Sequence, residues 1–413
     1  MDTQGIGRRI AYWRERRRMT QADFGALMGQ SRRWVQSLEA GARQSDPRLS
    51  VIERAARVLQ VRMEVLLDDT PRVQCIDGVE LDAIRTALQR HDVLTGTADD
   101  DGAEPLPVAA LDRRLHHARA AFQAGHFASL GTLVPSLLVD TNRAAARHED
   151  EDRLAAFRLL SLTLELTEGA AIKYGDTDLA LVSGHRAVAA AERSEDPVIM
   201  ASAARHLADA MTMHGQADAA AAFAIAAAAR LESDLRRRGA DGLSVLGMLY
   251  LKAAMAKATA AASDDTRAAP AARAVTPLLD QADEHANELG VDGNAVWTAF
   301  GPTNARLYRV AAHVSLSQGA DAVAVAEDIP NPSREALPKE RRAHLLTDLA
   351  RGLTQAGRRE EAVDTLLDAE REAKEEVLCR PRTRELVEDL RLLGAGSAEG
   401  RLRALAARCG LPG

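Results

Sequence analysis

The chain has 413 residues, of which 46% are hydrophobic and 3% aromatic, and its formal net charge is −7. This length exceeds one ordinary domain. The sequence has no uninterrupted run of 18 apolar residues and no basic start followed by a hydrophobic segment, so neither a membrane span nor a secretion signal is expected. Its three cysteines, Cys75, Cys379 and Cys409, are far apart. They form no metal-binding motif and fit a reducing cytoplasm.

Residues 20–41 have the pattern of two short helices joined by a tight turn. Thr20 can cap the first helix, and Gly29 can adopt the left-handed backbone that the turn needs. Ser31 can cap the second helix, and Gly41 ends it. Apolar residues at helical spacing are expected to point inward: Phe24, Leu27 and Met28 on the first helix, and Val35 and Leu38 on the second. The pattern predicts a helix–turn–helix.

This pattern resembles the Cro-type, or XRE-type, helix–turn–helix family over about residues 5–69. The resemblance rests on Ile6-Gly7, Thr20-Gln21, a small residue at 25, the turn at 29–31 and Leu38-Glu39-Ala40-Gly41, followed by two further helices marked by Leu49, Ile52, Ala56 and Leu59 and by residues 61–67. The family more usually has alanine where this chain has Gly25. The resemblance implies a five-helix head that binds double-stranded DNA.

The resemblance also implies which residues contact DNA. The expected contacts are Gln21, Ser31, Arg32, Arg33, Gln36 and Ser37. Gln21 matches a position that contacts a backbone phosphate in the family, and Arg32 and Arg33 lie in the turn that reads bases. An arginine there can bond to O6 and N7 of guanine, so we expect a half-site with a G·C pair.

Two other residues of this region match a structural ion pair of the family, Arg14 and Glu39, and neither is expected to contact DNA. Trp34 has two interpretations, packing at the domain rim or contact with the sugar–phosphate backbone. Residues 1–69 hold 13 arginines and nine carboxylates, a net charge of +4, so the rest of the chain totals −11. The densest basic patch is at residues 14–18. Phosphate therefore attracts the head and not the body.

A connection follows the head. Residues 79–91 can form one bridging helix through Leu81, Ile84 and Leu88. Residues 95–107 are mostly small, acidic or proline, including Asp99-Asp100-Asp101, with almost nothing to bury, and are expected to form a solvated linker. The body of the protein is expected from residue 108 onward.

The body has the periodicity of amphipathic helices and no convincing strand alternation. Five similar turns contain a glycine suited to the left-handed cap between antiparallel helices, namely Gly125, Gly175, Gly215, Gly319 and Gly357. The long gap between the third and fourth can hold two or three degenerate units. The body resembles the tetratricopeptide repeat, best over residues 343–373, and stacked pairs of this kind form a superhelix with a concave face.

A Cro-type head joined to such a body resembles two groups of proteins. One comprises the peptide-sensing quorum regulators of Gram-positive bacteria, and the other comprises actinobacterial regulators of similar length. Both imply a bacterial homodimer whose repeats can sense an effector. Alanine-rich helices such as residues 219–230 have faces that permit the close approach of a second copy.

The sequence contains no phosphate-binding loop, no nucleophile elbow and no zinc-protease motif, so no enzymatic activity, catalytic residue, cofactor or metal site is expected. His116 and His117 are adjacent, about 100° apart on a helix, and cannot clamp one metal ion. The other histidines, such as His206 and His344, stand singly on helices.

One segment of the body, residues 297–304, concentrates aromatic residues around a helix start. Its Gly301-Pro302 breaks one helix and begins the next. The side-chain amide of Asn304 can pair with a peptide bond of a ligand. The candidate effector-binding residues are Trp297, Phe300, Asn304 and Tyr308. The alternative is a helix start with aromatic packing across a repeat junction.

The sequence thus predicts an all-α protein with a helix–turn–helix DNA-binding domain at 1–69, a connecting helix and acidic linker at 70–107, and a repeat domain at 108–413. The expected function is a cytoplasmic, dimeric, DNA-binding transcriptional regulator with a peptide or small-molecule effector. The alternative is an interaction scaffold whose repeat domain recruits a partner protein, with DNA contact secondary.

Overall fold

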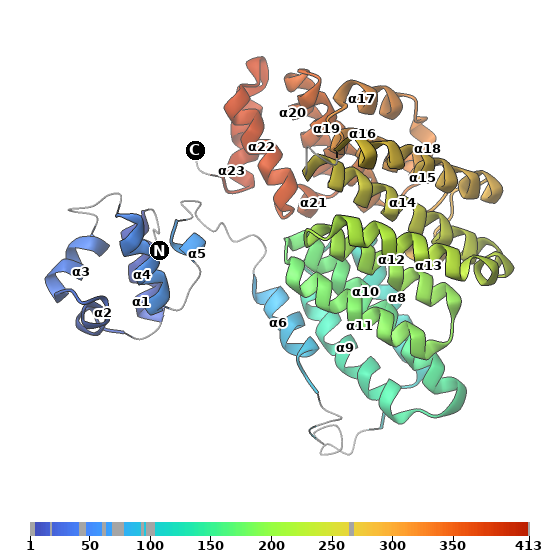
Figure 1. Cartoon of the computed structure of the whole chain (residues 1–413), viewed down its shortest axis with the longest axis horizontal. Coiled ribbons are helices and arrows are strands. Elements are labelled where there is room, and N and C mark those ends of the chain that lie inside the picture. Colours follow the sequence, from blue (N-terminus) through green and yellow to red (C-terminus); the bar gives the residue numbers. More distant parts are fainter. Residues whose placement is uncertain are drawn as a thin grey trace. The chain divides into compact units, whose positions relative to one another are not determined.

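The computed structural model describes residues 5–16, 19–40, 47–59, 63–67, 78–91, 95, 104–263 and 268–411, and these contain helices and no strand (Figure 1). The all-α prediction is confirmed. The chain divides into two compact units, one of Met1–Cys75 with Ala406–Gly413 and one of Ile76–Leu405. Gly41, Cys75, the arginines at 17 and 18, residues 61 and 62 and most of the predicted linker, including the run at 99–101, lie outside the described residues.

The head contains the five expected helices, α1 (Ile6–Arg16), α2 (Gln21–Met28), α3 (Arg32–Glu39), α4 (Leu49–Leu59) and α5 (Met63–Leu67). Their core includes Ile10, Phe24, Val35 and Leu59, all fully buried. Leu27 is 54% exposed, so its predicted inward position is wrong. The reason is its place one residue before the buried Met28, which turns its side chain about 100° away.

Two glycines let the head helices approach closely. A Cβ added to Gly7 on α1 would lie 2.1 Å from the carbonyl oxygen of Leu38 on α3. A Cβ on Gly25 would lie 2.9 Å from the carbonyl oxygen of Gln30. The close packing around Gly25 accounts for glycine at this position, despite its cost inside a helix.

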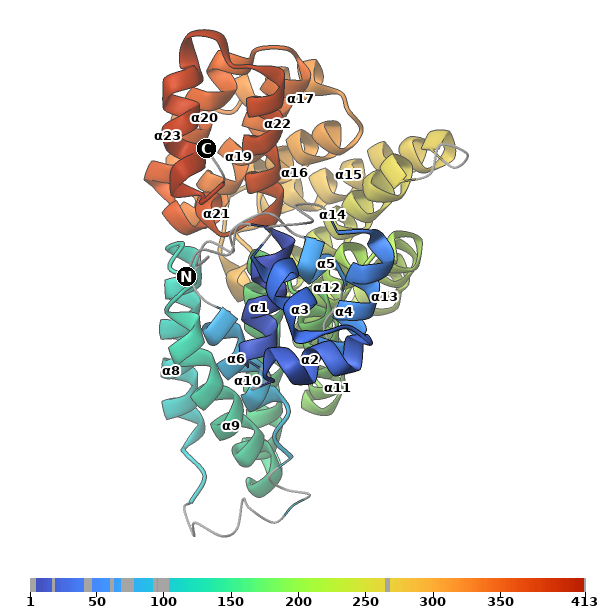
Figure 2. The same cartoon turned by 90° about the vertical axis from the view of Figure 1, so that its left-hand side faces the viewer.

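The second unit consists of antiparallel helix pairs (Figures 1 and 2). Its helices up to residue 315 are α6 (Gly78–Leu88), α8 (Val108–Gln123), α9 (Leu130–Arg147), α10 (Asp150–Tyr174), α11 (Thr177–Ser194), α12 (Pro197–Met213), α13 (Ala217–Arg237), α14 (Gly239–Ser263), α15 (Ala268–Leu289), η1 (Ala295–Trp297) and α16 (Pro302–Ser315). They continue as α17 (Gly319–Glu327), α18 (Asn331–Glu335), α19 (Lys339–Gln355), α20 (Arg359–Glu372), α21 (Lys374–Leu378), α22 (Pro381–Leu393), η2 (Gly396–Ala398) and α23 (Glu399–Arg408), of which the second unit includes the residues up to Leu405.

The predicted bridging helix is α6, and it belongs with the repeats. Leu81, Ile84 and Leu88 are buried in the same core cluster as residues of α9. The side chain of Arg186 also donates to the carbonyl oxygen of Leu88. The repeat unit therefore includes this helix, which the sequence placed in the connection.

Four of the five repeat glycines have the expected left-handed backbone: Gly125, Gly175, Gly215 and Gly357, with φ of 77–86°. Gly319 does not, because Ser317 takes the left-handed position there, with φ of 59°. Gly319 instead begins α17, where an added Cβ would lie 2.5 Å from the carbonyl oxygen of Gly352 on α19. This glycine permits close helix packing, and its predicted cap role is wrong.

The gap between Gly215 and Gly319 holds one complete helix pair, α14 with α15. It also holds the second helix of the preceding pair, α13, and the first of the next, α16. These four helices amount to two helix pairs, which agrees with the lower end of the two or three units expected. The helices of the complete pair are long, 25 and 22 residues. α14 is also the one described helix long and apolar enough to cross a membrane, but 67% of that window is buried inside the protein.

The repeat array closes on itself. The turn after α8 meets α20 and α21, because a Cβ on Gly125 would lie 2.6 Å from Cβ of Ala373 and the backbone N–H of Ala128 donates to Oε2 of Glu375 at 2.8 Å. The turn after α10 meets the start of α22, where a Cβ on Gly175 would lie 2.6 Å from Cγ of Pro381. The first helix pairs thus touch the last ones across the concave face.

Candidate functional site

The helix–turn–helix is built by its caps. The Thr20 hydroxyl accepts from the backbone N–H of Asp23, whose carboxylate accepts in return from the N–H of Thr20 at 3.1 Å. This capping box begins α2, and Gly29 ends it with φ of 64°. The Ser31 hydroxyl accepts from the N–H of Trp34 at 3.2 Å and begins α3. The predicted roles of Thr20, Gly29 and Ser31 as caps are confirmed.

The buried side of α3 is Val35, Leu38 and Glu39, and its opposite side is polar. Of the predicted DNA contacts, Ser31, Arg32, Arg33 and Gln36 are exposed, and Ser37 and Gln21 are half-buried. The Gln21 amide donates to Oε2 of Glu39 at 2.8 Å, so this side chain helps to fix the end of α3. Trp34 is half-buried against the head core, which agrees with packing at the rim.

The predicted pair of Arg14 and Glu39 is present and buried, with side-chain exposures of 8% each. Arg14 also donates to the carbonyl oxygen of Met19 at 2.8 Å. Both charges of the pair are therefore satisfied inside the head, and neither is available to DNA.

The repeat unit contains a second candidate site, a cavity of about 190 Å³. By volume it has room for roughly a dozen water molecules. All of its helical wall residues come from the first helix of a pair or from η1. They include Arg119 and Phe122 of α8, Glu168 and Lys173 of α10, Arg205, His206 and Asp209 of α12, Met248 and Lys252 of α14, Tyr308 of α16, Arg341 and His344 of α19, and Arg382 of α22. The cavity is the concave face of the superhelix.

The first polar group of the wall is centred on Arg119 and Glu165. The guanidinium of Arg119 donates to Oε2 of Glu165 at 3.1 Å and to the carbonyl oxygen of Leu162 at 2.6 Å. Burial lowers the pKa of Arg119 to about 10, although Glu165 opposes the shift. The Ser202 hydroxyl donates to the same carboxylate oxygen at 2.9 Å. Glu165 is thus held from two helices.

Next to this group lies a carboxyl–imidazole pair. Oε2 of Glu168 and Nδ1 of His206 are 2.6 Å apart. Burial, with repulsion from Asp209, raises the pKa of Glu168 well above its usual value. Burial, with repulsion from Arg205, lowers the pKa of His206 well below 6.5. Both shifts favour the uncharged form of their group, and the short contact couples the two titrations.

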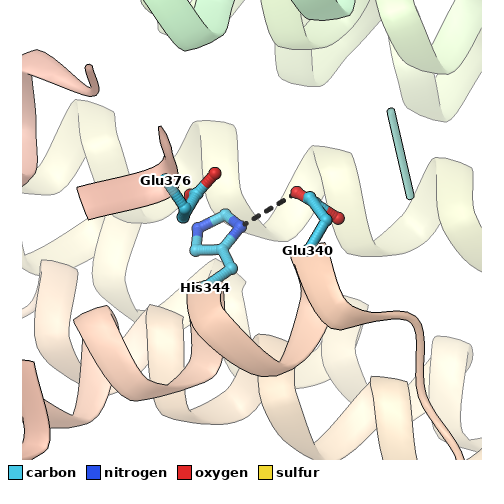
Figure 3. Close-up of side chains that lie close together, drawn as sticks. All are labelled: Glu340, His344 and Glu376. Carbon is cyan, nitrogen blue, oxygen red and sulfur yellow. Dashed lines mark ion pairs between the residues drawn. The ribbon is translucent and has the colours of Figure 1, made fainter. Parts of the chain in front are cut away.

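The opposite wall holds three acidic or basic groups that resemble a metal site. Ligand atoms of Glu340, His344 and Glu376 lie within 4.8 Å of one another (Figure 3). However, the ammonium of Lys173 donates to both carboxylates, at 2.7 Å from Oε2 of Glu376. Burial alone would raise the pKa of Glu340, but Lys173 and Arg341 outweigh it and lower the pKa. The lysine thus supplies the cation that these carboxylates need, and the residues do not fit a metal ion.

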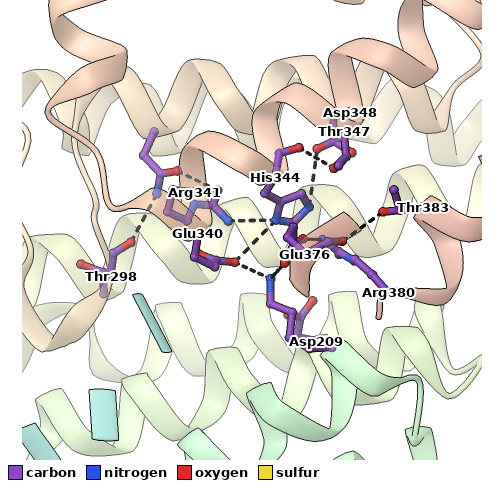
Figure 4. Close-up of polar contacts among 12 residues, drawn as sticks. Asp209, Thr298, Glu340, Arg341, His344, Thr347, Asp348, Glu376, Arg380 and Thr383 are labelled. Atoms are coloured by element: carbon purple, nitrogen blue, oxygen red, sulfur yellow. Dashed lines mark hydrogen bonds and ion pairs between the residues drawn. The ribbon is translucent and has the colours of Figure 1, made fainter. Parts of the chain in front are cut away.

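Arg341 and His344 complete this wall (Figure 4). Nη2 of Arg341 donates to Oδ1 of Asn304 at 2.8 Å, and its guanidinium lies 5.2 Å from the centre of the Tyr308 ring. Nη1 of Arg341 lies 3.4 Å from Nδ1 of His344. Burial, with repulsion from Arg380, lowers the pKa of His344 well below 6.5, so the ring is neutral and can accept this bond.

The structure separates the four predicted effector residues into two groups. Trp297 and Tyr308 line the cavity. Phe300 and Asn304 are completely buried behind the wall. The Asn304 amide donates to the carbonyl oxygen of Thr298 at 3.3 Å and accepts from Arg341. The prediction that Phe300 and Asn304 contact an effector directly is therefore wrong. Phe300 packs in the core, and the Asn304 amide bonds to groups of the protein itself.

Trp297 is held at the cavity by a strained segment. Val296, Trp297 and Ala299 all have positive φ, between 48° and 54°. Such backbone is costly for residues with side chains, above all for a β-branched valine. The strain places the Trp297 ring 5.0 Å from the Arg119 guanidinium. It therefore serves to place an aromatic ring over a buried cation.

Most of the cavity's charged residues were not singled out in the sequence. One signal in the sequence was the rarity of lysine. The chain has only five lysines, and two of them, Lys173 and Lys252, line this cavity. A second was the occurrence of ionisable residues three or four positions apart within otherwise apolar helices, as with Arg205 and Asp209. No spacing within one helix shows that several helices meet there.

Residues 6–69 match the family described as helix-turn-helix domain. No curated protein matches the chain. Among solved structures, the chain is similar to a Podosopora anserina protein described as a kinesin light chain with nearly identical TPR-like repeats, at 15% identity and a TM-score of 0.28, over 64% of this chain and 95% of that one. It is also similar to Bacillus thuringiensis PlcR in complex with the peptide PapR7 and DNA, at 13% identity and a TM-score of 0.28, over 70% of this chain and 98% of that one.

Proposed function

We propose that this chain is a sequence-specific DNA-binding transcriptional regulator. The observation that carries the proposal is α3, which begins at a serine cap directly after a tight turn and exposes Arg32, Arg33 and Gln36. In helix–turn–helix proteins the first turns of the second helix contact base edges in the major groove. The match of residues 6–69 to the helix-turn-helix domain family supports the same conclusion.

The charge distribution supports DNA binding by the head and not by the repeats. A net charge of +4 on residues 1–69 attracts phosphate, and −11 on the remainder repels it. The proposed partner is therefore a double-stranded DNA operator, bound in the bacterial cytoplasm by the head alone.

The repeat unit is proposed to pair two copies of the chain and to hold an effector. Two heads on one pseudo-palindrome bind more tightly than one, with half-sites roughly 34 Å apart. The cavity supports the effector role, because its wall is formed by helices from the first pair to the last. A ligand that binds this wall better in one arrangement can alter head spacing.

Genomic footprinting in cells tests the DNA-binding role, with the double variant Arg32→Ala, Arg33→Ala as the comparison. Discrete protected sites for the wild-type chain, lost in the variant, are the expected result. Absence of discrete sites would favour the scaffold alternative, in which the repeats recruit a partner protein. Sedimentation of the full chain tests pairing, and a monomer at micromolar concentration would contradict it.

A further inference from the structure

Buried polar atoms without a hydrogen-bond partner are concentrated around the cavity. Within the described part of the chain, they include Nε of Arg119, Arg205 and Arg341, Oε1 of Glu165 and Glu168, and Nε2 of His206. Buried polar groups are normally paired, and each unpaired one needs an explanation. Their concentration around one cavity indicates a binding surface whose hydrogen bonds are completed by a ligand.

Arg205 is the strongest of these cases. It is only 6% exposed and lies in the cavity wall on α12. The described residues offer its guanidinium no hydrogen bond and no carboxylate within 4.0 Å, although the neighbouring arginine Arg119 has both. A buried cation without a paired anion is costly to desolvate. The position therefore favours an anion.

The neighbouring cations are paired with carboxylates, and Arg205 is the one near them for which the described residues provide no paired carboxylate. Arg119 is compensated by Glu165, and Lys252 by Asp209 at 2.7 Å. The Glu168 carboxylate is bonded to His206 and not to Arg205. On the facing wall, Arg341 also lacks a carboxylate within 4.0 Å among the described residues and contacts the neutral amide of Asn304. The cavity thus has a positive excess inside an acidic unit.

The rest of the wall is apolar and adaptable. Met213, Met248 and Met255 line it, together with the rings of Phe122 and Trp297. Methionine side chains fit irregular apolar groups and contact aromatic rings favourably. The volume of about 190 Å³ suits a compact molecule. Pockets for larger organic ligands run from about 300 Å³ upward, so an extended peptide is disfavoured.

We infer that the cavity binds a small organic acid, with its carboxylate on Arg205 and its apolar or aromatic group against the methionines and Trp297. This inference rests on the proposed function only in treating the repeat unit as an effector-binding domain. A planar guanidinium matches a carboxylate in two parallel hydrogen bonds. The carboxylate of the ligand also provides a counter-charge for the Arg205 guanidinium.

Calorimetry and thermal melting of the full chain test the inference. The probes are 3-phenylpropionate and indole-3-acetate, with their primary amides as neutral analogues of the same shape. The acids should bind and raise the melting temperature, and the amides should bind at least about tenfold more weakly, because they lose a charge-assisted contact. Equal binding of acid and amide, or no binding of either acid, would overturn the inference.

Variants of Arg205 locate the contact. Arg205→Gln should weaken acid binding about 30-fold or more, and Arg205→Lys should retain part of the affinity. Arg230→Gln, an exposed arginine on α13, is the matched control and should bind like the wild type. Without ligand, Arg205→Gln should melt at or above the wild-type temperature, since it removes an uncompensated buried charge. A melting temperature far below wild type would make Arg205 a structural residue and contradict the inference.

Two further probes separate the alternatives. Inorganic phosphate lacks the apolar group and should bind more weakly than either acid. The peptide acetyl-Ala-Ala-Ala-Phe carries the same carboxylate on a longer chain, and binding of this peptide alone would replace the small acid with a peptide. None of these measurements uses DNA. Failure of acid binding and failure of operator binding are therefore observed independently.

Discussion

Arg14 on α1 donates from Nε to Oε1 of Glu39 at 2.6 Å and from Nη2 to Oε2 at 3.1 Å, and so joins α1 to the end of α3. Each single change to alanine strands a buried charge and should lower the free energy of unfolding of the head by about 3 kcal/mol. The double change should cost less than the sum of the two. Urea unfolding of the four proteins measures this, with Arg32→Ala as an exposed control. Additive effects would rule out the coupling.

The second prediction concerns base recognition. Alanine at Arg32 or Arg33 should cost about 1–3 kcal/mol at one G·C pair of the operator, because a bidentate contact with guanine is lost. Binding selection followed by sequencing measures the change in base preference. Arg57→Ala, an exposed arginine of α4 outside the turn, should leave the preference unchanged. If both recognition-helix variants keep the wild-type preference, α3 does not lie in the major groove as proposed.

The buried amide of Asn304 is expected to stabilise the repeat unit. Asn304→Ala should lower the free energy of unfolding of the repeat unit by about 1–3 kcal/mol, because it leaves Arg341 and the carbonyl oxygen of Thr298 without this buried partner. Tyr308→Phe is the comparison, since no hydrogen bond of the Tyr308 hydroxyl is observed among the described residues. Its melting temperature should match wild type. An unchanged melting temperature for Asn304→Ala would show that the amide contributes nothing to folding.

His344 should make the repeat unit less stable in mild acid. Its folded-state pKa is lowered well below 6.5, first by burial and then by Arg380 and Lys173. Below pH 6.5 the His344 ring is protonated in the unfolded chain but not in the folded chain. The free energy of unfolding therefore decreases as the pH is lowered, by up to about 1.4 kcal/mol per pH unit. The contribution is complete above pH 6.5 and is lost as the pH falls toward the folded-state value.

Urea unfolding at pH 7.5 and 5.5 measures this loss. His344→Gln should show a smaller difference between the two pH values than the wild type. His206 remains in that variant and acts in the same direction, because its pKa is also lowered. His117→Gln, an exposed histidine of α8, is the control. An undiminished difference in His344→Gln would assign the acid sensitivity to other groups.

The head could be predicted from the sequence because its determinants are local. Three residues within a segment of 12 define the motif. Thr20 begins α2, Gly29 ends it, and Ser31 begins α3. The ion pair of Arg14 and Glu39 followed from the family resemblance. Leu27 was misplaced because neighbouring apolar residues on a helix cannot all face one core.

The cavity could not be predicted in the same way. Helical periodicity identifies the apolar face of each helix, but it does not show which polar side chains meet after the repeats stack. Arg205 on α12 and Arg341 on α19 have two complete helix pairs between their own pairs along the chain, and both line the same cavity. The segment at 297–304 was recognised by its aromatic residues, yet burial divided them, with Trp297 on the wall and Phe300 behind it.

The closure of the array has a consequence for how the protein unfolds. Repeat proteins usually behave as one-dimensional chains of units, each coupled only to its neighbours, so their ends can fray independently. Here Lys173 of α10 bonds to Glu340 of α19 and Glu376 of α21, 167 and 203 residues away. The last repeats cannot separate from the second helix pair without breaking these bonds of Lys173. The unit is therefore expected to lose its structure in one cooperative step, with amide protons of both end pairs exchanging at similar rates.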